Sequence, residues 1–430
     1  MKIRLGLIGL GTVGTGVVKA IQRQKSFFKK SLGFEIEIVK IAVKNTRKKR
    51  DVKLPKGVIV NDPMLVCNDP NIDIVVELMG GETVAKKVVL QSLKQGKKVV
   101  TANKALLANH AKECFETAGK NDSCIGFEAS CAGGIPLIKC LRDGLIANEI
   151  IHLYGILNGT CNFILTQMLE RDMDFPVILK EAQEMGYAEA DPTFDIEGID
   201  TAHKLTILAS IAYGVYVDFR NIYIEGITKI SIRDLQALDE LGYNVKLLAL
   251  GNFSKKGLDL RVHPVAIPKD HPLSPVSGAY NAVHIRGDIV EDIMLSGPGA
   301  GMDPTASAVV GDIVDIILGK INESFHRTSP KQTKVNYIPI DEIKCSFYTR
   351  LVVKDHPGVL ASISSVLAKN KVSILAIHQQ KLSTKNQAEI IITTHKATNK
   401  DFYKAINVIK KAGYTVTEPI CIRCAQKDSF

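Results

Sequence analysis

An acidic segment in the middle of the chain holds residues whose types could do chemistry on a small charged substrate. Five carboxylates fall within twelve residues, and a lysine follows them: Glu189, Asp191, Asp195, Glu197, Asp200 and Lys204. Carboxylates can hold an ammonium group. A lysine in a partly desolvated site next to another cation has a lowered pKa, which suits proton transfer in both directions. The segment is therefore the candidate place of the chemistry.

The elements expected around this segment are an ordered loop and a helix. Pro192 and Gly198 favour a loop, and the sequence reads as helix from about Ile199. Asp200 and Lys204 then lie four residues apart on one helix face, close enough to pair. An acidic surface loop followed by an exposed ion pair is the alternative. The rest of the chain decides between the two interpretations.

Length and composition bound the class of protein. A chain of 430 residues predicts two to three domains, and 46% hydrophobic with 23% charged residues is typical of a soluble globular protein. No signal-peptide layout and no membrane-spanning apolar run is present. Nine scattered cysteines favour a reducing cytoplasm. Cys421 and Cys424 form one CxxC in a C-terminal tail, for which we predict no function.

The net charge of +10 could suggest a nucleic-acid partner. The lysines are spread along the chain, however, and no RNA- or DNA-binding motif accompanies them. A solvated lysine-rich surface accounts better for the charge, so we expect neither a nucleic acid nor a membrane as partner.

The N-terminal segment carries the fingerprint of a dinucleotide-binding turn. Lys2–Ile8 reads as an apolar strand, Gly9–Gly14 has the spacing Gly-x-Gly-x-x-Gly, and a helix is expected from Gly16 to about Arg23. Glycines allow a tight turn and a close approach to a pyrophosphate, which the NH groups of a helix N-terminus can bind. The predicted contacts are Gly9, Gly11, Thr12, Val13 and Gly14.

The second predicted strand, Glu35–Val43, ends in a basic cluster, Lys44–Arg50. Enzymes that use NAD usually carry an acidic residue at this strand end, where it binds the ribose hydroxyls. Lys44 favours the 2′-phosphate of NADP instead. The spacing from the glycine turn is longer than usual, and a solvated basic loop is the alternative.

Two further strands predict a ligand crevice at the edge of a parallel sheet. Asp73–Glu77 reads as a buried strand that leads to Gly80, and Lys98–Thr101 reads as the next strand, which leads to Asn103 and Lys104. Ligands of open α/β sheets bind at the carboxyl ends of the strands. Lys104 is therefore a candidate for contacting the reacting oxygen.

A second domain is expected in the middle of the chain. Ile150–Leu157 reads as a strand, and the loop Asn158–Asn162 before a helix at Phe163 offers hydrogen bonds to a small polar ligand. A second glycine-rich turn, Gly297–Gly301, opens a helix at 306–318 that could return to the nucleotide domain. Further strands are expected at 222–228, 243–253, 257–268 and 279–285.

The C-terminal residues restart the pattern in the order βαββαβ, which is that of a ferredoxin-like module. The expected elements are a strand at 346–353, a helix to Lys369, strands at 371–380 and 387–394, a helix at 399–412 and a strand at 414–421. The fold class is therefore α/β. Its expected parts are a Rossmann-type domain at 1–135 with the helix 302–320, an α+β substrate-binding and dimerisation domain at 136–320, a linker at 321–345 and the ferredoxin-like module at 346–425.

Taken together, these segments resemble homoserine dehydrogenase over nearly the whole chain. The resemblance is carried by Gly9–Gly14, Glu77–Gly81, Thr101–Lys104, Ala129–Pro136, Gly155–Thr160, Ala188–Pro192, Asp195–Asp200 with Lys204, and Gly297–Ser307. The C-terminal module resembles an ACT domain, whose turn Asp355–Leu360 is the usual ligand-binding loop. The resemblance implies NAD(P)-dependent interconversion of L-homoserine and L-aspartate 4-semialdehyde, in the biosynthesis of threonine, methionine and isoleucine.

The resemblance also implies a role for each site residue. Lys204 would donate and accept the proton, Lys104 would contact the hydroxyl or carbonyl oxygen, and Asp200 would orient Lys204 and bind substrate. Glu189 would hold the substrate ammonium, and Asp195 would support the network of Asp200 with Lys204. Further substrate contacts would come from Asn158, Gly159 and Thr160.

Cofactor, cation and effector follow from the same resemblance. The cofactor would be NADP or NAD, with contacts from the glycine turn and from Lys44, Gly80, Asn103, Lys104 and Gly301. A monovalent cation, usually sodium, would be held by backbone oxygens of Glu128, Cys131, Gly133 and Ile135. An amino acid, most of all threonine, would act as allosteric inhibitor through Asp355, Gly358 and Leu360. The assembly would be a homodimer or homotetramer.

Two alternatives remain, the first from another functional class and the second an enzyme of the same fold. One is a non-catalytic regulator that senses NAD(P) and an amino acid. The other is a related amino-acid dehydrogenase, such as aspartate dehydrogenase. The intact set Lys104, Glu189, Asp200 and Lys204 argues against a silent sensor, and the Asn-Gly-Thr loop with the acidic segment favours homoserine.

Overall fold

The computed structural model describes residues 1–321, 325, 335–383 and 386–425. These residues form two compact units, each built from segments far apart in the sequence. Unit 1 comprises Met1–Leu153, Ala202–Ile222 and Tyr280–Val335, and unit 2 comprises Tyr154–Thr201, Tyr223–Ala279 and the chain from Asn336 onward. Within the predicted linker, residues 322–324 and 326–334 lie outside the described residues.

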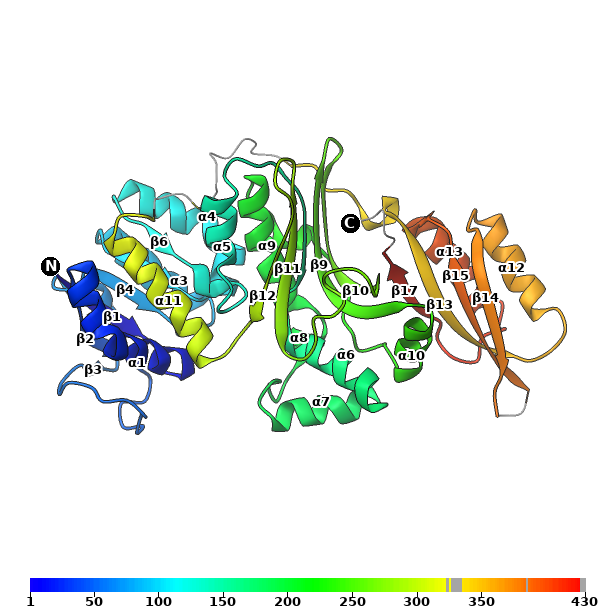
Figure 1. Cartoon of the computed structure of the whole chain (residues 1–430), viewed down its shortest axis with the longest axis horizontal. Helices are drawn as coiled ribbons and strands as arrows, with labels where there is room; N and C mark the ends of the chain where they lie inside the picture. Colours follow the sequence, from blue (N-terminus) through cyan, green and yellow to red (C-terminus); the bar gives the residue numbers. More distant parts are fainter. Residues whose placement is uncertain (322–324, 326–334, 384–385, 426–430) are drawn as a thin grey trace. The chain divides into compact units, whose positions relative to one another are not determined.

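Unit 1 contains a six-stranded parallel sheet of the doubly wound type (Figure 1). Its order is β3-β2-β1-β4-β5-β6, so the direction of winding reverses between β1 and β4. Sheets of this kind bind ligands beside the reversal, at the carboxyl ends of the strands. The strands are β1 Lys2–Ile8, β2 Glu35–Ala42, β3 Ile59–Val60, β4 Ile74–Glu77, β5 Lys98–Thr101 and β6 Ile125–Gly126.

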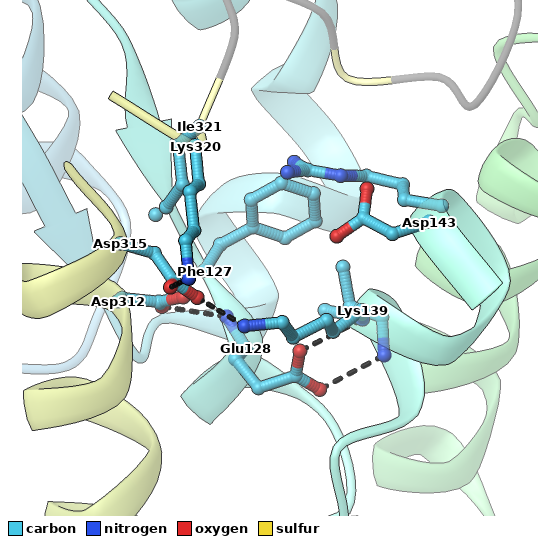
Figure 2. A pocket seen from close by; sticks show the side chains of 11 residues that line it. Phe127, Glu128, Lys139, Asp143, Asp312, Asp315, Lys320 and Ile321 are labelled. Carbon is cyan, nitrogen blue, oxygen red and sulfur yellow. Dashed lines mark hydrogen bonds and ion pairs between the residues drawn. The ribbon is translucent and has the colours of Figure 1, made fainter. Parts of the chain in front are cut away.

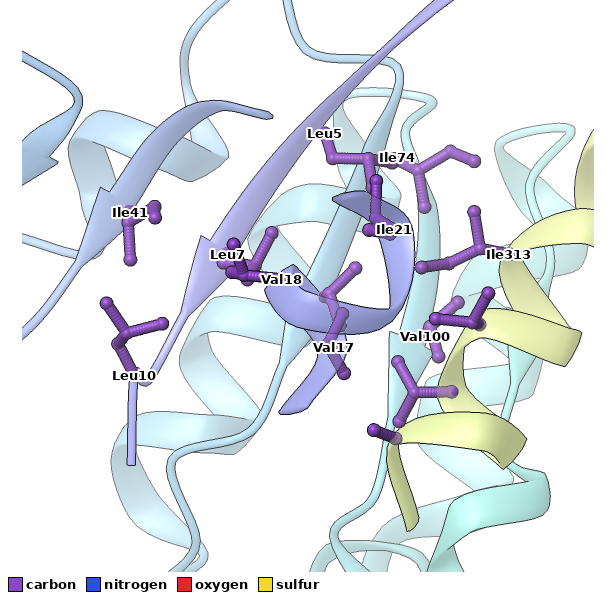
Figure 3. Packing of buried hydrophobic residues seen from close by; sticks show 14 of the residues in the cluster. Leu5, Leu7, Leu10, Val17, Val18, Ile21, Ile41, Ile74, Val100 and Ile313 are labelled. Atoms are coloured by element: carbon purple, nitrogen blue, oxygen red, sulfur yellow. The ribbon is translucent and has the colours of Figure 1, made fainter. Parts of the chain in front are cut away.

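Helices α1 and α11 pack together against this sheet, although nearly 300 residues separate them in the chain. Figure 3 shows Val17 and Val18 of α1 and Ile313 of α11 in one buried cluster with side chains of the sheet. The two helices approach closely at Gly16, where an added Cβ would lie 2.7 Å from Cγ of Met302. The helices of this part are α1 Thr12–Phe27, α2 Met64–Cys67, α3 Thr83–Lys94, α4 Lys104–Lys120 and α11 Met302–Ile317.

The remainder of unit 1 includes a short helix, most of α9 and strands of a second sheet. A short helix, α5 Leu137–Lys139, follows the sheet, and the larger part of α9 Ile199–Tyr213 belongs here from Ala202 onward. The first half of β7 Ile150–Ile156 lies beside β11 Tyr280–Gly287, which pairs antiparallel with β12 Glu291–Pro298. Among the described helices, none is long and apolar enough to cross a membrane.

Unit 2 begins with the second half of β7 and the helices that follow it. The long strands β9 Tyr243–Ser254 and β10 Gly257–Pro268 pair antiparallel along their whole length. Alternate side chains of such strands point to opposite faces, and both strands are mostly buried because both faces are covered. The other elements are α6 Gly159–Arg171, α7 Phe175–Glu184, α8 Thr193–Ile196, β8 Tyr223–Ile224 and α10 Ile232–Glu240.

The C-terminal part of unit 2 is the predicted βαββαβ module. Its strand order, β17-β13-β15-β14, places the first and third strands of the motif in the centre, as in ferredoxin-like folds. Helices α12 and α13 cover the sheet, and the rings of Phe347 and Phe402 stack in the core between them. The elements are β13 Lys344–Lys354, α12 Val359–Lys369, β14 Ile374–Lys381, β15 Gln387–Thr394, β16 Ala397–Thr398, α13 Asn399–Lys411 and β17 Ile420–Cys424.

The α/β class and the order of this module are confirmed, but several predicted elements were wrong in position. The last strand begins at Ile420 instead of residue 414, because Pro419 just before it cannot donate a ladder hydrogen bond. Cys421 and Cys424 therefore lie in a strand and not in a tail. The expected strand at 222–228 is reduced to β8, and the sequence prediction missed α7, α10 and β12.

The first turn of α6 was also misjudged. The sequence predicted a loop to residue 162, whereas the helix begins at Gly159 with Asn158 as its N-cap. Similarly, residues 192–198 are not all loop, because Thr193–Ile196 form the short helix α8. Asn158 caps α6, and its Nδ2 donates to Asp195 of α8, so that polar residues which favour loops in isolation are held in helical geometry.

Candidate active site

The glycine turn between β1 and α1 is shaped by close backbone contacts. Gly9 has φ +104°, a conformation that favours glycine, and its NH donates to the carbonyl of Ala42 at 3.0 Å. A Cβ at Gly14 would lie 2.4 Å from the carbonyl oxygen of Gly9. A Cβ at Gly11, in contrast, would meet no described atom within 4 Å. The turn thus leaves open space before the N-terminus of α1, where NH groups attract an anion.

A buried carboxylate organises the carboxyl ends of β4 and β5. Glu77 is fully buried, and it accepts hydrogen bonds from Oγ1 of Thr101 at 2.6 Å and from the NH of Met79 at 2.8 Å. Burial raises the pKa of Glu77. No role was predicted for Glu77, although a carboxylate at the end of an apolar strand is a usable signal.

Asn103 connects these two strand ends and starts the next helix. Its Nδ2 donates to the carbonyl of Gly81 at 2.6 Å, and its Oδ1 accepts from the NH of Leu106 at 3.0 Å, which caps α4. Lys104 is consequently the first residue of α4, at the sheet edge where ligands are expected. Gly80 has φ +70° and faces open space in the same turn, and Lys44 is exposed just after β2.

The predicted cation loop is buried and tightly curled. Ala132 and Gly133 both have φ +55°, and a Cβ at Gly133 would lie 2.6 Å from the backbone of Gly299. The NH of Gly134 donates to the carbonyl of Pro298 at 3.3 Å, so the loop packs on the glycine turn before α11. The carboxylate of Glu128 accepts the NH groups of Ile138 and Lys139 at 2.8 Å and thereby caps α5.

The backbone of this loop fits the chemistry of a monovalent cation. The carbonyl of Glu128 accepts from the NH of Cys131 at 3.3 Å, and that of Ile135 accepts from the NH of Leu137 at 2.7 Å. Each carbonyl oxygen retains a second lone pair, and hard cations prefer oxygen ligands. Cys131 also connects the loop to α9, since its Sγ lies 4.0 Å from the carbonyl oxygen of Lys204.

A small cavity of about 50 Å³ lies behind the same loop (Figure 2). Oδ2 of the buried Asp312 accepts the NH of Glu128 at 2.8 Å, and Lys139 pairs with Asp315. Burial raises the pKa of Asp312 to about 8 and also raises the pKa of Glu128. Because the cavity is too small for an amino acid, these groups support the loop instead of binding substrate.

In unit 2 the structure brings together residues that lie far apart in the sequence around Asn158. Its Oδ1 accepts from the NH of Cys161 at 2.8 Å, while its Nδ2 donates to Oδ1 of Asp195 at 2.8 Å and to Oδ2 of Asp200 at 3.0 Å. Oγ1 of Thr160 donates to the carbonyl of Tyr187 at 2.6 Å. Asp200 is 1% exposed. Two carboxylates are thus held side by side by one amide.

The other predicted substrate and catalytic residues differ in their burial. Glu189 is exposed, and Nε2 of Gln183 donates to its carbonyl at 3.0 Å, which fixes the backbone while the carboxylate faces solvent. A Cβ at Gly159 would lie 2.7 Å from the carbonyl oxygen of Ala279, so only glycine fits there. Lys204 is buried on α9, one turn after Asp200, and it belongs to unit 1 together with Lys104.

One buried lysine near Asn162 escaped the sequence analysis. Lys246 of β9 donates to Oδ1 of Asn162 at 3.2 Å and to the carbonyl of Val276 at 2.6 Å, and burial lowers its pKa to about 8. Its position in a strand among apolar residues gave no signal of this role. Because the described hydrogen bonds of Lys246 all go to protein oxygens, its role is structural.

The predicted effector loop has the geometry of a helix entry. Gly358 has φ +92° and directly precedes α12. The NH of Ser362, in the first turn of this helix, donates to the carbonyl of Gly358 at 2.9 Å. The NH of Asp355 donates to the carbonyl of Asn386 at 2.8 Å, and Leu360 is half-buried. The loop therefore holds a left-handed glycine next to an exposed carboxylate.

Comparison with known proteins gives matches along nearly the whole chain. Three family models match: "Homoserine dehydrogenase, NAD binding domain" at residues 9–128, "Homoserine dehydrogenase" at residues 136–314 and "ACT domain" at residues 347–413. A homoserine dehydrogenase of Neisseria gonorrhoeae is 44% identical over 95% of this chain and 95% of its own length. One of Helicobacter pylori is 43% identical over 98% of this chain and 99% of its own length.

Solved structures give the same result. The crystal structure of a homoserine dehydrogenase from Thiobacillus denitrificans has a TM-score of 0.92 at 42% identity and covers 99% of both chains. A hyperthermophilic archaeal homoserine dehydrogenase in complex with NADPH has a TM-score of 0.64 at 28% identity and covers 74% of this chain and 98% of that one.

Proposed function

Because the chain belongs to the homoserine dehydrogenase family, with an NAD-binding domain and an ACT domain, we propose that it interconverts L-homoserine and L-aspartate 4-semialdehyde. In the oxidising direction C4 of homoserine gives a hydride to the nicotinamide, and its hydroxyl loses a proton. Membership of this family argues against a silent sensor and against a dehydrogenase of another amino acid. The observation that carries the substrate assignment is the carboxylate pair Asp195 and Asp200 held by Asn158.

The proposed division of labour follows the charges of the site. Lys204 takes the hydroxyl proton during oxidation and returns it during reduction, and Lys104 donates a hydrogen bond to the same oxygen. Asp200, one helical turn before Lys204, orients it and binds substrate. Glu189 and Asp195 attract the substrate ammonium. Support for these roles comes from the burial of Lys204 and Asp200 and from the placement of Lys104 at the start of α4.

We propose NADP as the preferred nucleotide. The Gly9–Gly14 turn would hold the pyrophosphate, and the exposed Lys44 would pair with the 2′-phosphate. Gly80, Asn103 and Gly301 would complete the nucleotide site. A related archaeal structure contains NADPH, which is consistent with this choice. The carbonyl oxygens of Glu128, Cys131, Gly133 and Ile135 would hold a sodium ion as a structural ligand.

The wider setting is part of the same proposal. The reaction would serve threonine, methionine and isoleucine biosynthesis, and threonine would inhibit it through Asp355, Gly358 and Leu360 of the ACT domain. A homodimer or homotetramer and a cytoplasmic location are expected, the latter because nine scattered cysteines suit a reducing compartment.

Absorbance of the reduced nicotinamide tests the reaction and the choice of cofactor. Purified protein in sodium-containing buffer receives L-homoserine or L-aspartate with NADP+ or NAD+. We expect reduction with homoserine and not with aspartate, at a higher kcat/KM for NADP+. Reduction with aspartate alone would overturn the substrate assignment, and equal use of both nucleotides would overturn the role of Lys44.

A second assay tests regulation. Threonine is added to the wild type, to Asp355→Ala and to Asp341→Ala, which changes an exposed carboxylate outside the loop. We expect inhibition of the wild type and the control and a weaker response of Asp355→Ala. Equal inhibition of all three proteins would place regulation elsewhere.

A further inference from the structure

Three side chains of unit 1 form a cluster that the dehydrogenase reaction does not use. His152 lies on β7, His284 on β11 and Asp292 on β12, three neighbouring strands in the order β12-β11-β7. The pair β11 and β12 is seen side by side in Figure 1. One ligand atom of each lies within 4.8 Å of the others. Both histidines are about nine-tenths or more buried, and Asp292 is half exposed, so the cluster reaches solvent on one side.

The pairing of the strands places these side chains on a common face. His284 is opposite Met294, and Arg286 is opposite Asp292 in the antiparallel ladder of β11 and β12. Side chains of directly opposed residues share a face, and residues two apart on one strand share it too. His284 and Asp292 are therefore diagonal neighbours by construction. The ring of His152 stacks on that of His284 from the other side, with centroids 5.6 Å apart.

One pair of ligand atoms already has the separation expected in a tetrahedral metal site. Zinc binds imidazole nitrogen and carboxylate oxygen at about 2.0–2.2 Å, so two ligands at a tetrahedral angle stand about 3.3–3.6 Å apart. Nε2 of His284 and Oδ1 of Asp292 are 3.3 Å apart. His152 lies within 4.8 Å of both, and rotation of the half-exposed Asp292 or of a ring closes the remaining distance.

We propose that His152, His284 and Asp292 bind one divalent transition-metal ion of the zinc class, with a solvent molecule as fourth ligand. Two imidazoles and a carboxylate are a donor set that zinc favours. Nη1 of Arg286 lies 3.7 Å from Oδ2 of Asp292 and competes for the carboxylate, but its side chain is 41% exposed and can turn into solvent.

The place of the cluster gives the ion a mechanical consequence. Strand β12 runs from Glu291 into Pro298, whose carbonyl accepts the NH of Gly134 in the predicted cation loop. An ion bound by side chains of β12, β11 and β7 therefore stabilises the hairpin of β11 and β12. The contact between Pro298 and Gly134 lies at one end of this hairpin. A ligand that binds only the folded state raises its stability in proportion to its occupancy.

Cobalt titration tests the proposal. The full-length protein is stripped with a chelator, dialysed and titrated with Co²⁺, whose visible bands report tetrahedral coordination, and Zn²⁺ is then added as competitor. We expect one ion per chain, displacement by Zn²⁺, and a rise in the unfolding temperature on binding.

Matched variants distinguish this site from adventitious binding. His284→Gln and Asp292→Asn should weaken binding by more than about tenfold, since even removal of an outer-shell partner costs 10- to 100-fold in affinity. His395→Gln and Asp341→Asn change exposed residues elsewhere and should leave binding unchanged. Arg286→Gln should strengthen it. Because Asp292 is half exposed, Asp292→Asn keeps the test valid even where His284→Gln does not fold. No bound Co²⁺ in the wild type, or equal binding by Asp292→Asn and the controls, would overturn the proposal.

Discussion

Replacing Asn158 by serine separates its two structural functions. The amide oxygen of Asn158 caps α6, and its Nδ2 donates to the carboxylates of Asp195 and Asp200. Serine caps helices about as well as asparagine does. The serine hydroxyl, however, is too short to donate to both carboxylates, so Asn158→Ser retains the cap and removes the pair of donors.

The expected loss can be worked out from the two hydrogen bonds. A hydrogen bond to a charged group contributes about 1.5–3 kcal/mol to stability. The bond to Asp200, which is 1% exposed, counts in full, whereas that to the partly exposed Asp195 is discounted because water replaces the donor. We therefore expect the free energy of unfolding to fall by about 2–4 kcal/mol, and kcat/KM for homoserine to fall with it.

Urea unfolding followed by circular dichroism measures this loss. Thr398→Ser serves as control, because it exchanges one capping hydroxyl for another on α13 and should change the unfolding free energy by less than about 0.5 kcal/mol. If Asn158→Ser unfolds at the same urea concentration as the wild type and the control, the amide does not hold the carboxylate pair and the reasoning is wrong.

Three further perturbations follow from the structure. Asp312 keeps its proton in the folded state up to a pKa of about 8 but loses it near 3.8 in the unfolded chain, so the free energy of unfolding falls as pH rises between these values. Asp312→Asn should remove about 1.4 kcal/mol per pH unit of that fall. Thermal unfolding at different pH that gives the variant and the wild type the same dependence on pH would contradict this. Gly14→Ala puts a methyl group 2.4 Å from the carbonyl of Gly9 and should weaken NADP binding by calorimetry, whereas Gly144→Ala, which meets nothing described within 4 Å, should not. Lys44→Ala should raise KM for NADP+ and leave KM for NAD+ unchanged; a parallel rise for both would show that Lys44 does not contact the 2′-phosphate.

Features set by local sequence were predictable. The Gly9–Gly14 turn, the helix Ile199–Tyr213 and the strand Gln387–Thr394 depend on nearby residues: glycines that allow a tight turn, or a run of apolar side chains. The alternation of strands and helices likewise sufficed for the α/β class and for the ferredoxin-like module.

Features set by distant contacts were not predictable. The contacts of Asn158 with Asp195 and Asp200 join residues 37 and 42 positions away, and no local pattern indicated them. Strand β12 begins with Glu291 and Asp292 and stays half exposed, so its sequence lacks the apolar pattern that predicts a strand. Pairing with β11 is what makes this segment a strand. Asp312 is an acid buried by tertiary packing, for which the sequence carries no local pattern.

The most direct test of the account is single-turnover oxidation of homoserine by Lys204→Met. Methionine retains the length of the buried side chain and removes its amine, and Lys112→Met on the exposed face of α4 is the control. Loss of a positioned acid and base should slow hydride transfer by about 10²–10⁴-fold, with unchanged NADP+ affinity and unfolding temperature. A folded Lys204→Met that turns over homoserine at nearly the wild-type rate would contradict the central claim.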